Sequence, residues 1–181
     1  MFHLLHNFLG YALCLEDQNM FLEFAANNFE TKSFQTIGYG RFYCALQRQN
    51  QRLYQRSLAL QKQVMTRLGF PQFQPEPEYG NFIDVSLPSS RVPEHKDSAP
   101  DGFVLMRCNF FLQKPDLGGD PIIDGVIVDV KEREGWCLAA SRSFHSSVPV
   151  SGKKNRIILS LGALISEQEF EKGKREKDKR K

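Results

Sequence analysis

A proline-rich segment at residues 71–80 (PQFQPEPEYG) divides the chain into two parts with different hydrophobic periods. Before it, Leu46–Leu68 contains no glycine or proline, and its apolar residues roughly follow a helical stripe that ends at Gly69. After it, short apolar segments recur at spacings typical of an all-β sandwich or barrel. We therefore expect a helical part followed by a β-sandwich of the jelly-roll type.

Residues 1–70 are expected to be helical. One or two further helices are predicted within Phe2–Phe29, and Gly38-Tyr39-Gly40 is predicted to form a turn. In the second part a turn is expected at Gly118-Gly119. The predicted strands are Phe82–Leu87, Phe103–Leu112, Ile122–Val130, Trp136–Ala140, Val148–Val150 and Arg156–Leu161.

Length and composition favour one folded domain. The chain has 181 residues, of which 41% are hydrophobic, so it can build one sizeable core but not two. No run of 18 apolar residues occurs, and the first residues lack the basic start and cleavage site of a signal peptide. We expect a single domain over residues 1–170, with a helical platform at 1–75, a jelly-roll core at 79–164 and a basic tail at 171–181.

The positive charge of the chain is concentrated at its end. The net charge is +3, but Lys172–Lys181 alone holds seven Lys or Arg and two acidic residues, so the rest of the chain is slightly acidic. A nearly neutral body argues against a broad nucleic-acid surface, although the basic tail leaves that partner open. The tail is interpreted as a solubilising end. Its alternating charges could also support a solvated helix that continues from the preceding residues.

The four cysteines are too far apart in sequence for a CxxC motif. Cys108 and Cys137 lie in apolar strand-like runs and are predicted to be buried thiols. A reduced, cytoplasmic setting fits this pattern best.

Two of the four histidines lie at informative positions, whereas His3 and His6 lie in an apolar N-terminal stretch. His95 and Asp97 form an HxD triplet in a polar loop before the strongest strand, and alternate side chains of an extended segment can reach one ion. His145 ends a later strand-like segment. Two imidazoles and one carboxylate around a metal with open positions are the pattern expected for non-haem Fe(II) oxygenases.

Three further polar residues lie in the strand segments around this motif. Arg156 begins the last strand, eleven residues after His145, and its planar fork could pair with a distal carboxylate of a co-substrate. Arg107 and Asn109 share one face of FVLMRCNFFL, opposite Cys108 and Phe110. They are expected either to line a pocket or to face solvent and pair with acidic residues such as Asp124 or Asp129.

Taken together, residues 79–164 resemble the 2-oxoglutarate- and Fe(II)-dependent dioxygenases. The parts occur in the family's order: His95–Asp97, a hydrophobic strand, Gly118-Gly119, and the run HSSVPVSGKKNR that begins at His145. The resemblance implies a double-stranded β-helix with helices packed against one sheet. It also implies iron ligands at His95, Asp97 and His145, and an Arg156 contact to the far carboxylate of 2-oxoglutarate.

One position departs from the family's pattern. Many members place Ser or Thr two residues after the arginine as a second carboxylate contact, but this chain has Ile158 there and a serine at Ser160. A regular strand would put Arg156, Ile158 and Ser160 on one face, so Ser160 or another strand could supply that contact. Lys153-Lys154 in the preceding turn are alternative cations for the same carboxylate.

The resemblance implies an oxygenase with Fe(II) as cofactor and 2-oxoglutarate and O2 as co-substrates. Such an enzyme would convert 2-oxoglutarate to succinate and, most often, hydroxylate a small molecule, an amino acid or a protein side chain. Three alternatives remain: a cupin-like metal protein without 2-oxoglutarate chemistry, a non-catalytic binding module, and a nucleic-acid oxidative demethylase. The sequence carries no substrate motif, and it does not indicate an oligomeric state.

Overall fold

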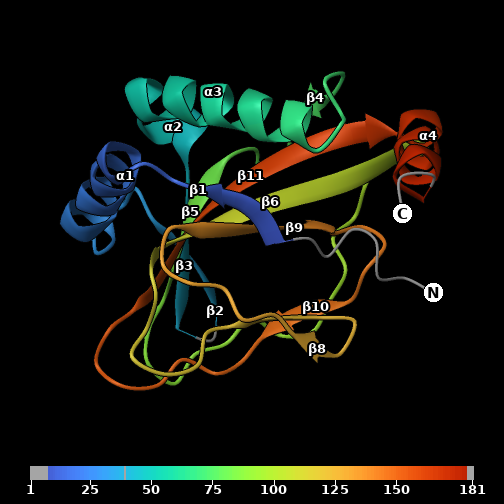
Figure 1. Ribbon diagram of the computed structural model, residues 1–181. Helices are drawn as coiled ribbons and strands as arrows, with labels where there is room; N and C mark the ends of the chain where they lie inside the picture. Colours follow the sequence, from blue (N-terminus) through green and yellow to red (C-terminus); the bar gives the residue numbers. More distant parts are fainter. Residues whose placement is uncertain (1–7, 39, 179–181) are drawn as a thin grey trace.

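The computed structural model describes residues 8–38 and 40–178, which form two antiparallel sheets and helices (Figure 1). Strands of the large sheet follow the order β1-β9-β6-β11-β5-β3-β2, with β4 also paired to β11, and the small sheet has the order β10-β7-β8. In chain order the elements are β1 (Phe8–Ala12), α1 (Leu15–Asn28), β2 (Gln35–Gly38), β3 (Arg41–Ala45), α2 (Leu46–Gln49), α3 (Gln51–Arg67), β4 (Gln74–Pro75), β5 (Phe82–Ser86), β6 (Phe103–Gln113), β7 (Pro121–Ile123), β8 (Val126–Ile127), β9 (Glu134–Ala139), β10 (His145–Ser147), β11 (Arg156–Ser166) and α4 (Glu167–Asp178).

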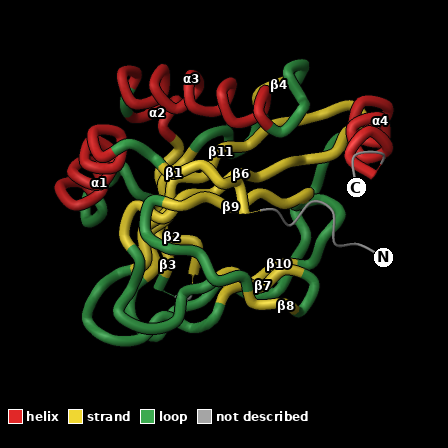
Figure 2. Tube along the Cα trace, viewed as in Figure 1, coloured by secondary structure: helices red, strands yellow, loops and turns green. Residues whose placement is uncertain are grey.

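The two faces of the large sheet pack against different elements. Helices α2 and α3 cover one face, and the small sheet lies across from the other (Figure 2). On β6, Met106 and Phe110 belong to the apolar core shared with α1, α2 and α3, whereas Leu105 and Phe111 belong to a smaller cluster on the opposite face. This arrangement confirms the predicted jelly-roll class with supporting helices, and it places the second face toward the small sheet.

The N-terminal part is less helical than predicted. Helix α1 lies in the expected region, but β1, β2 and β3 are strands, so the expectation that residues 1–70 are helical is wrong there. Strand β1 pairs with β9 and β3 pairs with β5, both distant in sequence, so these pairings override the weak local pattern. The predicted turn is the β2–β3 connection, where Gly38 and Gly40 both have positive φ. His3 and His6 lie outside the described residues.

The long predicted helix is interrupted once. Asn50 leaves the helical conformation at φ −152° and ψ 101°, and it separates α2 from α3. Its side-chain oxygen accepts the Leu53 N–H at 3.1 Å, which caps the N-terminus of α3. Helix α3 ends before Gly69, which has φ +90°, so the predicted stop is confirmed.

The strands of the second part follow the predictions with two exceptions. Strands β5, β6, β9 and β11 lie where the sequence pattern placed them. The predicted strand Ile122–Val130 is instead the hairpin of β7 and β8, because Asp124 and Gly125 turn the chain with positive φ. Val148–Val150 is not a strand, and the short strand β10 ends before it. Pro149 has no N–H, while Val148 and Val150 donate to the carbonyls of Asp120 and Ser90. The Gly118-Gly119 turn is as predicted, with φ of 71° and 73°.

The prediction for Cys108 and Cys137 is confirmed for their burial and wrong for their free thiols. Strands β6 and β9 place Cys108 and Cys137 directly opposite each other, with Cα atoms 4.3 Å apart, and the two form a disulfide. The spacing of cysteines in the sequence does not show which residues of distant strands lie opposite each other. The disulfide also removes the free thiols from which a reduced setting was inferred. The cytoplasmic location stays a prediction.

Helix α4 continues into the basic segment. Phe170 stacks on Phe70 with ring centroids 6.2 Å apart, which attaches the first turns of α4 to the core. The helical extension considered for the tail is present as far as Asp178. Among the described residues, no helix is both long and apolar enough to cross a membrane.

Asp17 provides a stability test. Its buried carboxylate accepts from Arg56 Nε at 2.6 Å and Nη2 at 2.7 Å, joining α1 to α3, and this hydrogen bonding lowers the pKa of Asp17 despite burial. We expect Asp17→Asn to reduce the free energy of unfolding at pH 7 by on the order of 1 kcal/mol, because Arg56 is partly exposed and screened. Urea denaturation measures this change.

The same pair has a defined pH dependence. Because the folded pKa of Asp17 lies below its ordinary value, its contribution is present at neutral pH and is lost as the pH falls below about 4. The stabilities of the wild type and Asp17→Asn should therefore converge toward pH 3. The exposed neighbour Glu16→Gln serves as the control, and an equal difference at both pH values would contradict the linkage.

Candidate functional site

His95 and His145 lie opposite each other on two neighbouring extended segments. The backbone N–H of each donates to the carbonyl of the other, with N···O distances of 3.0 and 2.9 Å. His145 begins β10, and the loop that carries His95 runs beside it, where Val92 also contacts Ser147. The two imidazole centroids are consequently 4.2 Å apart.

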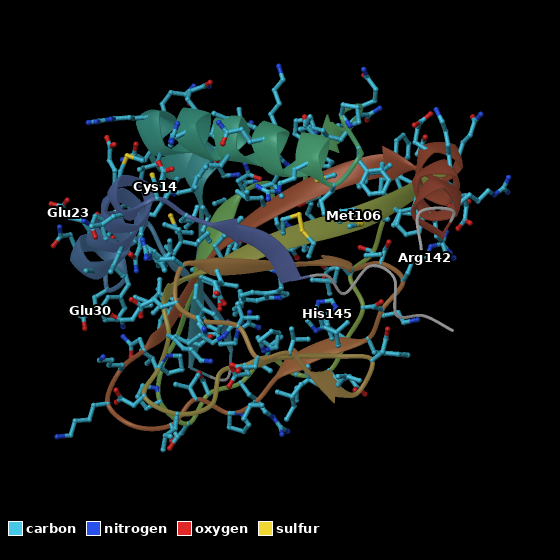
Figure 3. All side chains as sticks on the ribbon, in the orientation of Figure 1. Cys14, Glu23, Glu30, Met106, Arg142 and His145 are labelled. Carbon is cyan, nitrogen blue, oxygen red and sulfur yellow. A yellow bond between two sulfur atoms is a disulfide. The ribbon has the colours of Figure 1, made fainter. Side chains whose placement is uncertain are left out.

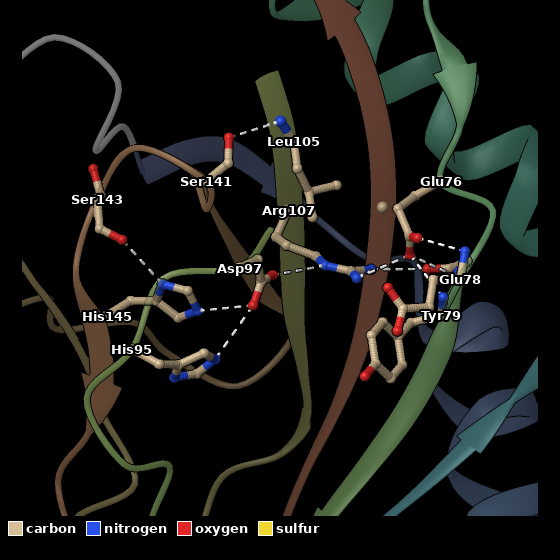
Figure 4. Close-up of polar contacts among 12 residues, drawn as sticks. Glu76, Glu78, Tyr79, His95, Asp97, Leu105, Arg107, Ser141, Ser143 and His145 are labelled. Carbon is tan, nitrogen blue, oxygen red and sulfur yellow. Dashed lines mark hydrogen bonds and ion pairs between the residues drawn. The ribbon is translucent and has the colours of Figure 1, made fainter. Parts of the chain in front are cut away.

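Asp97 completes the cluster from the same loop. Extended backbone puts its side chain on the side of His95, so Oδ1 lies 3.3 Å from Nε2 of His95 and 3.7 Å from Nε2 of His145. One donor atom from each residue lies within 4.8 Å of the other two. Figure 4 shows both imidazoles directed at the carboxylate. The structure thus brings together the three residues that the sequence singled out as ligands.

Backbone carbonyls determine which imidazole nitrogens face the centre. Nδ1 of His95 lies 2.8 Å from the Pro93 carbonyl oxygen, and Nδ1 of His145 lies 3.2 Å from that of Ser143. A carbonyl oxygen only accepts, so we assign the proton of each neutral ring to Nδ1. Each Nε2 then presents its lone pair toward Asp97, which is the tautomer that a metal ligand needs.

The three groups have different pKa shifts. When His95 is protonated, its Nε2–H can donate to Asp97, and this hydrogen bond raises the pKa of His95. Burial and the neighbouring His95 lower the pKa of His145. Burial acts to raise the pKa of Asp97, but the hydrogen bond from His95 and the charge of Arg107 outweigh it and hold the value at about 2. At neutral pH the cluster therefore has an ionised carboxylate and a neutral His145.

Arg107 holds the other oxygen of Asp97. This β6 residue is almost fully buried, and its Nε lies 3.3 Å from Asp97 Oδ2. Its Nη2 pairs with Glu76 at 3.0 Å, and its Nη1 donates to the Gly80 carbonyl at 2.9 Å. Arg107 therefore lies at the predicted pocket, and the alternative pairing with Asp124 or Asp129 is wrong. Its guanidinium orients Asp97 so that Oδ1 faces the histidines.

Glu76 and Gly162 in turn fix the position of Arg107. The Glu76 carboxylate accepts the backbone N–H groups of residues 78, 79 and 80 at 2.6–2.9 Å, which ties the proline-rich segment to the guanidinium (Figure 4). At Gly162 on β11, an added Cβ would overlap Arg107 Nη1 and lie 2.9 Å from the Gly80 carbonyl oxygen. The absence of a side chain there leaves the space through which Arg107 reaches Glu76.

Arg156 lies at the start of β11 in a second buried charged group. Its Nε donates to the Gly119 carbonyl at 2.8 Å, and its Nη1 lies 3.2 Å from Oδ2 of Asp84. Asp84 is fully buried and also pairs with Arg41 Nη2 at 2.8 Å. Burial lowers the pKa of Arg156 to about 10, so the guanidinium keeps its charge at neutral pH.

One cavity of about 550 Å³ connects the two charged groups. Its wall includes Arg156, Ile158 and Ser160 from alternate positions of β11, as the strand pattern predicted, together with Asn109 of β6. Ser160 Oγ is buried and has no hydrogen-bond partner among the described residues. Figure 3 shows that His145 lies between the two sheets.

The two lysines of the preceding turn lie elsewhere. Lys153 and Lys154 do not line the cavity, and their backbone N–H groups donate to the Asp116 carboxylate at 2.7 and 3.2 Å. Arg156 is therefore the cation of this segment that faces the cavity.

Three charged residues of the site were not singled out from the sequence. Asp84 left a signal, because a carboxylate inside the apolar run FIDVS must have a buried partner. Glu76 lies in a proline-rich break, and Arg41 lies in a part expected to be helical, so neither position carried a pattern. Strand pairing and the shape of the cavity bring them into the site.

Arg107→Met tests the buried network. The change leaves Glu76 and Asp97 without a cation, and breaking a buried pair in this way is expected to cost about 3–5 kcal/mol. Thermal and urea denaturation measure the loss. The double variant Glu76→Gln/Arg107→Met should regain part of it, because one unpaired buried charge is then removed. Additive losses from Glu76→Gln and Arg107→Met would show that the two side chains do not interact.

Comparison with solved structures defines the class of fold. No family profile and no curated protein matches the sequence of this chain. The two facing sheets form a jelly-roll fold similar to that of several solved structures of 2-oxoglutarate-dependent enzymes.

Three solved structures illustrate the likeness. A viral collagen prolyl hydroxylase from Paramecium Bursaria Chlorella virus-1, in complex with 2-oxoglutarate, has a TM-score of 0.61 and 11% identity over 84% of this chain and 91% of its own. A Trichoplax adhaerens prolyl hydroxylase with a hypoxia inducible factor peptide has a TM-score of 0.63 and 12% identity over 91% and 83%. The α-ketoglutarate-dependent carbocyclase SnoK of nogalamycin biosynthesis has a TM-score of 0.65 and 12% identity over 84% and 76%. At these identities the likeness concerns the fold.

Proposed function

We propose that this protein is an Fe(II)- and 2-oxoglutarate-dependent oxygenase. The observation that carries the proposal is that one cavity joins a His-Asp-His cluster to a buried arginine at its other end. The cluster suits a metal ion, and the arginine suits the carboxylate of a co-substrate. A cupin-like metal protein would need only the first of these, so the buried Arg156 favours the oxygenase.

The donor set fits Fe(II). His95, Asp97 and His145 supply two imidazole nitrogens and one carboxylate oxygen, the facial arrangement that leaves coordination positions open. The Nδ1 hydrogen bonds to backbone carbonyls keep both Nε2 atoms directed inward, and Arg107 keeps Asp97 ionised and oriented. These three residues would hold the metal.

The opposite end of the cavity fits 2-oxoglutarate. Arg156 would bind the far carboxylate through its planar fork, and the unpartnered Ser160 Oγ could donate a second hydrogen bond to the same ligand. Asn109 and Arg107 line the wall between Ser160 and the metal cluster. Ser160 would thus replace the contact that the family often places at the position of Ile158.

Bound Fe(II) and 2-oxoglutarate would supply the activation of O2: 2-oxoglutarate would be converted to succinate and CO2, with one oxygen atom entering succinate and the other a substrate C–H bond, most simply to give an alcohol. The protein's own contribution is positional. The cluster sets the coordination geometry, Arg156 orients the co-substrate, and the apolar wall formed by Trp136 and Leu138 excludes water. The substrate class stays open between a small molecule, an amino acid and a protein side chain.

Anaerobic addition of Fe(II) and 2-oxoglutarate tests the proposal. A chelate of the two in the site should give a visible absorption band, and succinate should then form on exposure to O2 with a competent substrate. His145→Ala should abolish the band, because the two protein ligands that remain are too few to hold the metal. Glu94→Gln, which changes an exposed residue beside His95, is the control and should retain it. A band of equal intensity in His145→Ala would refute the metal site.

A second test separates the candidate cations. Arg156→Ala should weaken 2-oxoglutarate binding by about 30-fold, equivalent to about 2 kcal/mol for a charge-assisted bidentate contact, and leave Fe(II) binding in place. Lys153→Ala and Lys154→Ala should bind 2-oxoglutarate as the wild type does. Titration of the absorption band gives these affinities, and circular dichroism checks that Arg156→Ala is folded. Loss of affinity in the lysine variants alone would reassign the contact to the turn.

A further inference from the structure

A row of polar side chains crosses three strands at the Arg156 end of the cavity. Arg41 on β3 is in register with Ser86 on β5, and Ser86 is in register with Arg156 on β11. Residues in register on neighbouring strands share one face of the sheet. Arg41 and Arg156 accordingly both line the cavity, although they are 115 positions apart in the chain.

This row contains more positive than negative charge. Asp84 accepts from Arg41 Nη2 at 2.8 Å, from Arg156 Nη1 at 3.2 Å and from Ser86 Oγ at 3.0 Å. Asp120 also lies near Arg156, but it pairs with Lys114 at 2.7 Å. One carboxylate thus serves two guanidiniums, and an excess positive charge taken out of water calls for an anion.

Two buried polar atoms of the cavity wall lack partners. Within the described part of the chain, Arg41 Nε and Ser160 Oγ are buried and form no hydrogen bond. An unpaired buried donor is unfavourable, and such groups are rare in folded proteins unless a ligand or water satisfies them. Arg41 Nε is therefore a donor available for a ligand oxygen, even though the Nη2 atom of the same side chain is occupied by Asp84.

We propose that Arg41 is a second carboxylate-binding residue of this cavity, which together with Arg156 holds the far carboxylate of the co-substrate. Asp84 spaces the two guanidiniums, and the carboxylate balances their remaining charge. This inference rests on the proposed function for the identity of the co-substrate. It adds the β2–β3 hairpin to the parts of the chain that bind it.

Two ligands test Arg41 independently. Anaerobic titration with Fe(II) and 2-oxoglutarate reports binding of the full co-substrate, and glutarate without metal reports the carboxylate contacts alone. Trp136 is the only tryptophan, lines the cavity and lies 6.0 Å from the Arg156 guanidinium, so its fluorescence follows glutarate binding. Arg41→Gln should weaken both ligands by about tenfold, as expected for the loss of one charge-assisted hydrogen bond.

Further variants separate ligand binding from a structural role. Arg52→Gln removes one positive charge from the exposed side of α3 and should bind both ligands as the wild type does. Arg41→Lys keeps a cation beside Asp84 but lacks the Nε–H, so it should be nearly as stable as the wild type in thermal denaturation and still bind 2-oxoglutarate more weakly. That separation of affinity from stability is the signature of a binding residue.

The outcomes distinguish this inference from the proposed function. Affinities of Arg41→Gln and Arg41→Lys within twofold of wild type would overturn the role of Arg41 and leave it as a partner of Asp84. Glutarate binding that depends on both arginines supports the two-cation site even if no band forms with Fe(II), in which case only the oxygenase proposal fails. A wild-type protein that binds neither ligand overturns both.

Discussion

The pairing of β6 with β11 is the interaction on which the rest of the structure depends. Strand β6 (Phe103–Gln113) and strand β11 (Arg156–Ser166) are antiparallel and lie at the centre of the large sheet. Because side chains alternate, one face of this pair builds the core beneath the helices, and the other carries the polar residues of the cavity. If either strand slipped by one residue, its side chains would exchange faces, and Arg107 or Arg156 would enter the apolar core. Burial on both faces therefore fixes the register.

Buried charge is the second organising feature. Arg107 balances Asp97 and Glu76 at one end of the cavity, and Asp84 is shared by Arg41 and Arg156 at the other. The first group has more negative charge and the second has more positive charge. A metal ion and a carboxylate ligand are complementary to these two ends, so one electrostatic pattern accounts for both halves of the proposed site.

The sequence predicted the site residues better than it predicted the N-terminal elements. His95 and Asp97 could be paired because alternate positions of an extended segment share a side, and Arg107 and Asn109 could be placed on one face for the same reason. Strands β1 and β3 could not be found, because each pairs with a strand far away in the chain. The edge strand β2 pairs with β3, but its four residues are all exposed, so it carries no alternating apolar pattern. The Cys108–Cys137 disulfide escaped prediction on the same ground, since it depends on the register of β6 with β9.

The sequence by itself determined the class of fold, the order of the C-terminal strands and the identity of the three candidate metal ligands. The fold class and the strands follow from local periodicity, and the His95–Asp97 pair follows from a short spacing. His145 joins that pair as a candidate ligand through the resemblance of the motif order to the oxygenase family. Only the tertiary structure decided that Glu76 braces Arg107, that Gly162 leaves room for it, and that Arg41 and Arg156 share Asp84. Those contacts join residues that are 31 to 72 positions apart, and strand register rather than local pattern brings such residues together.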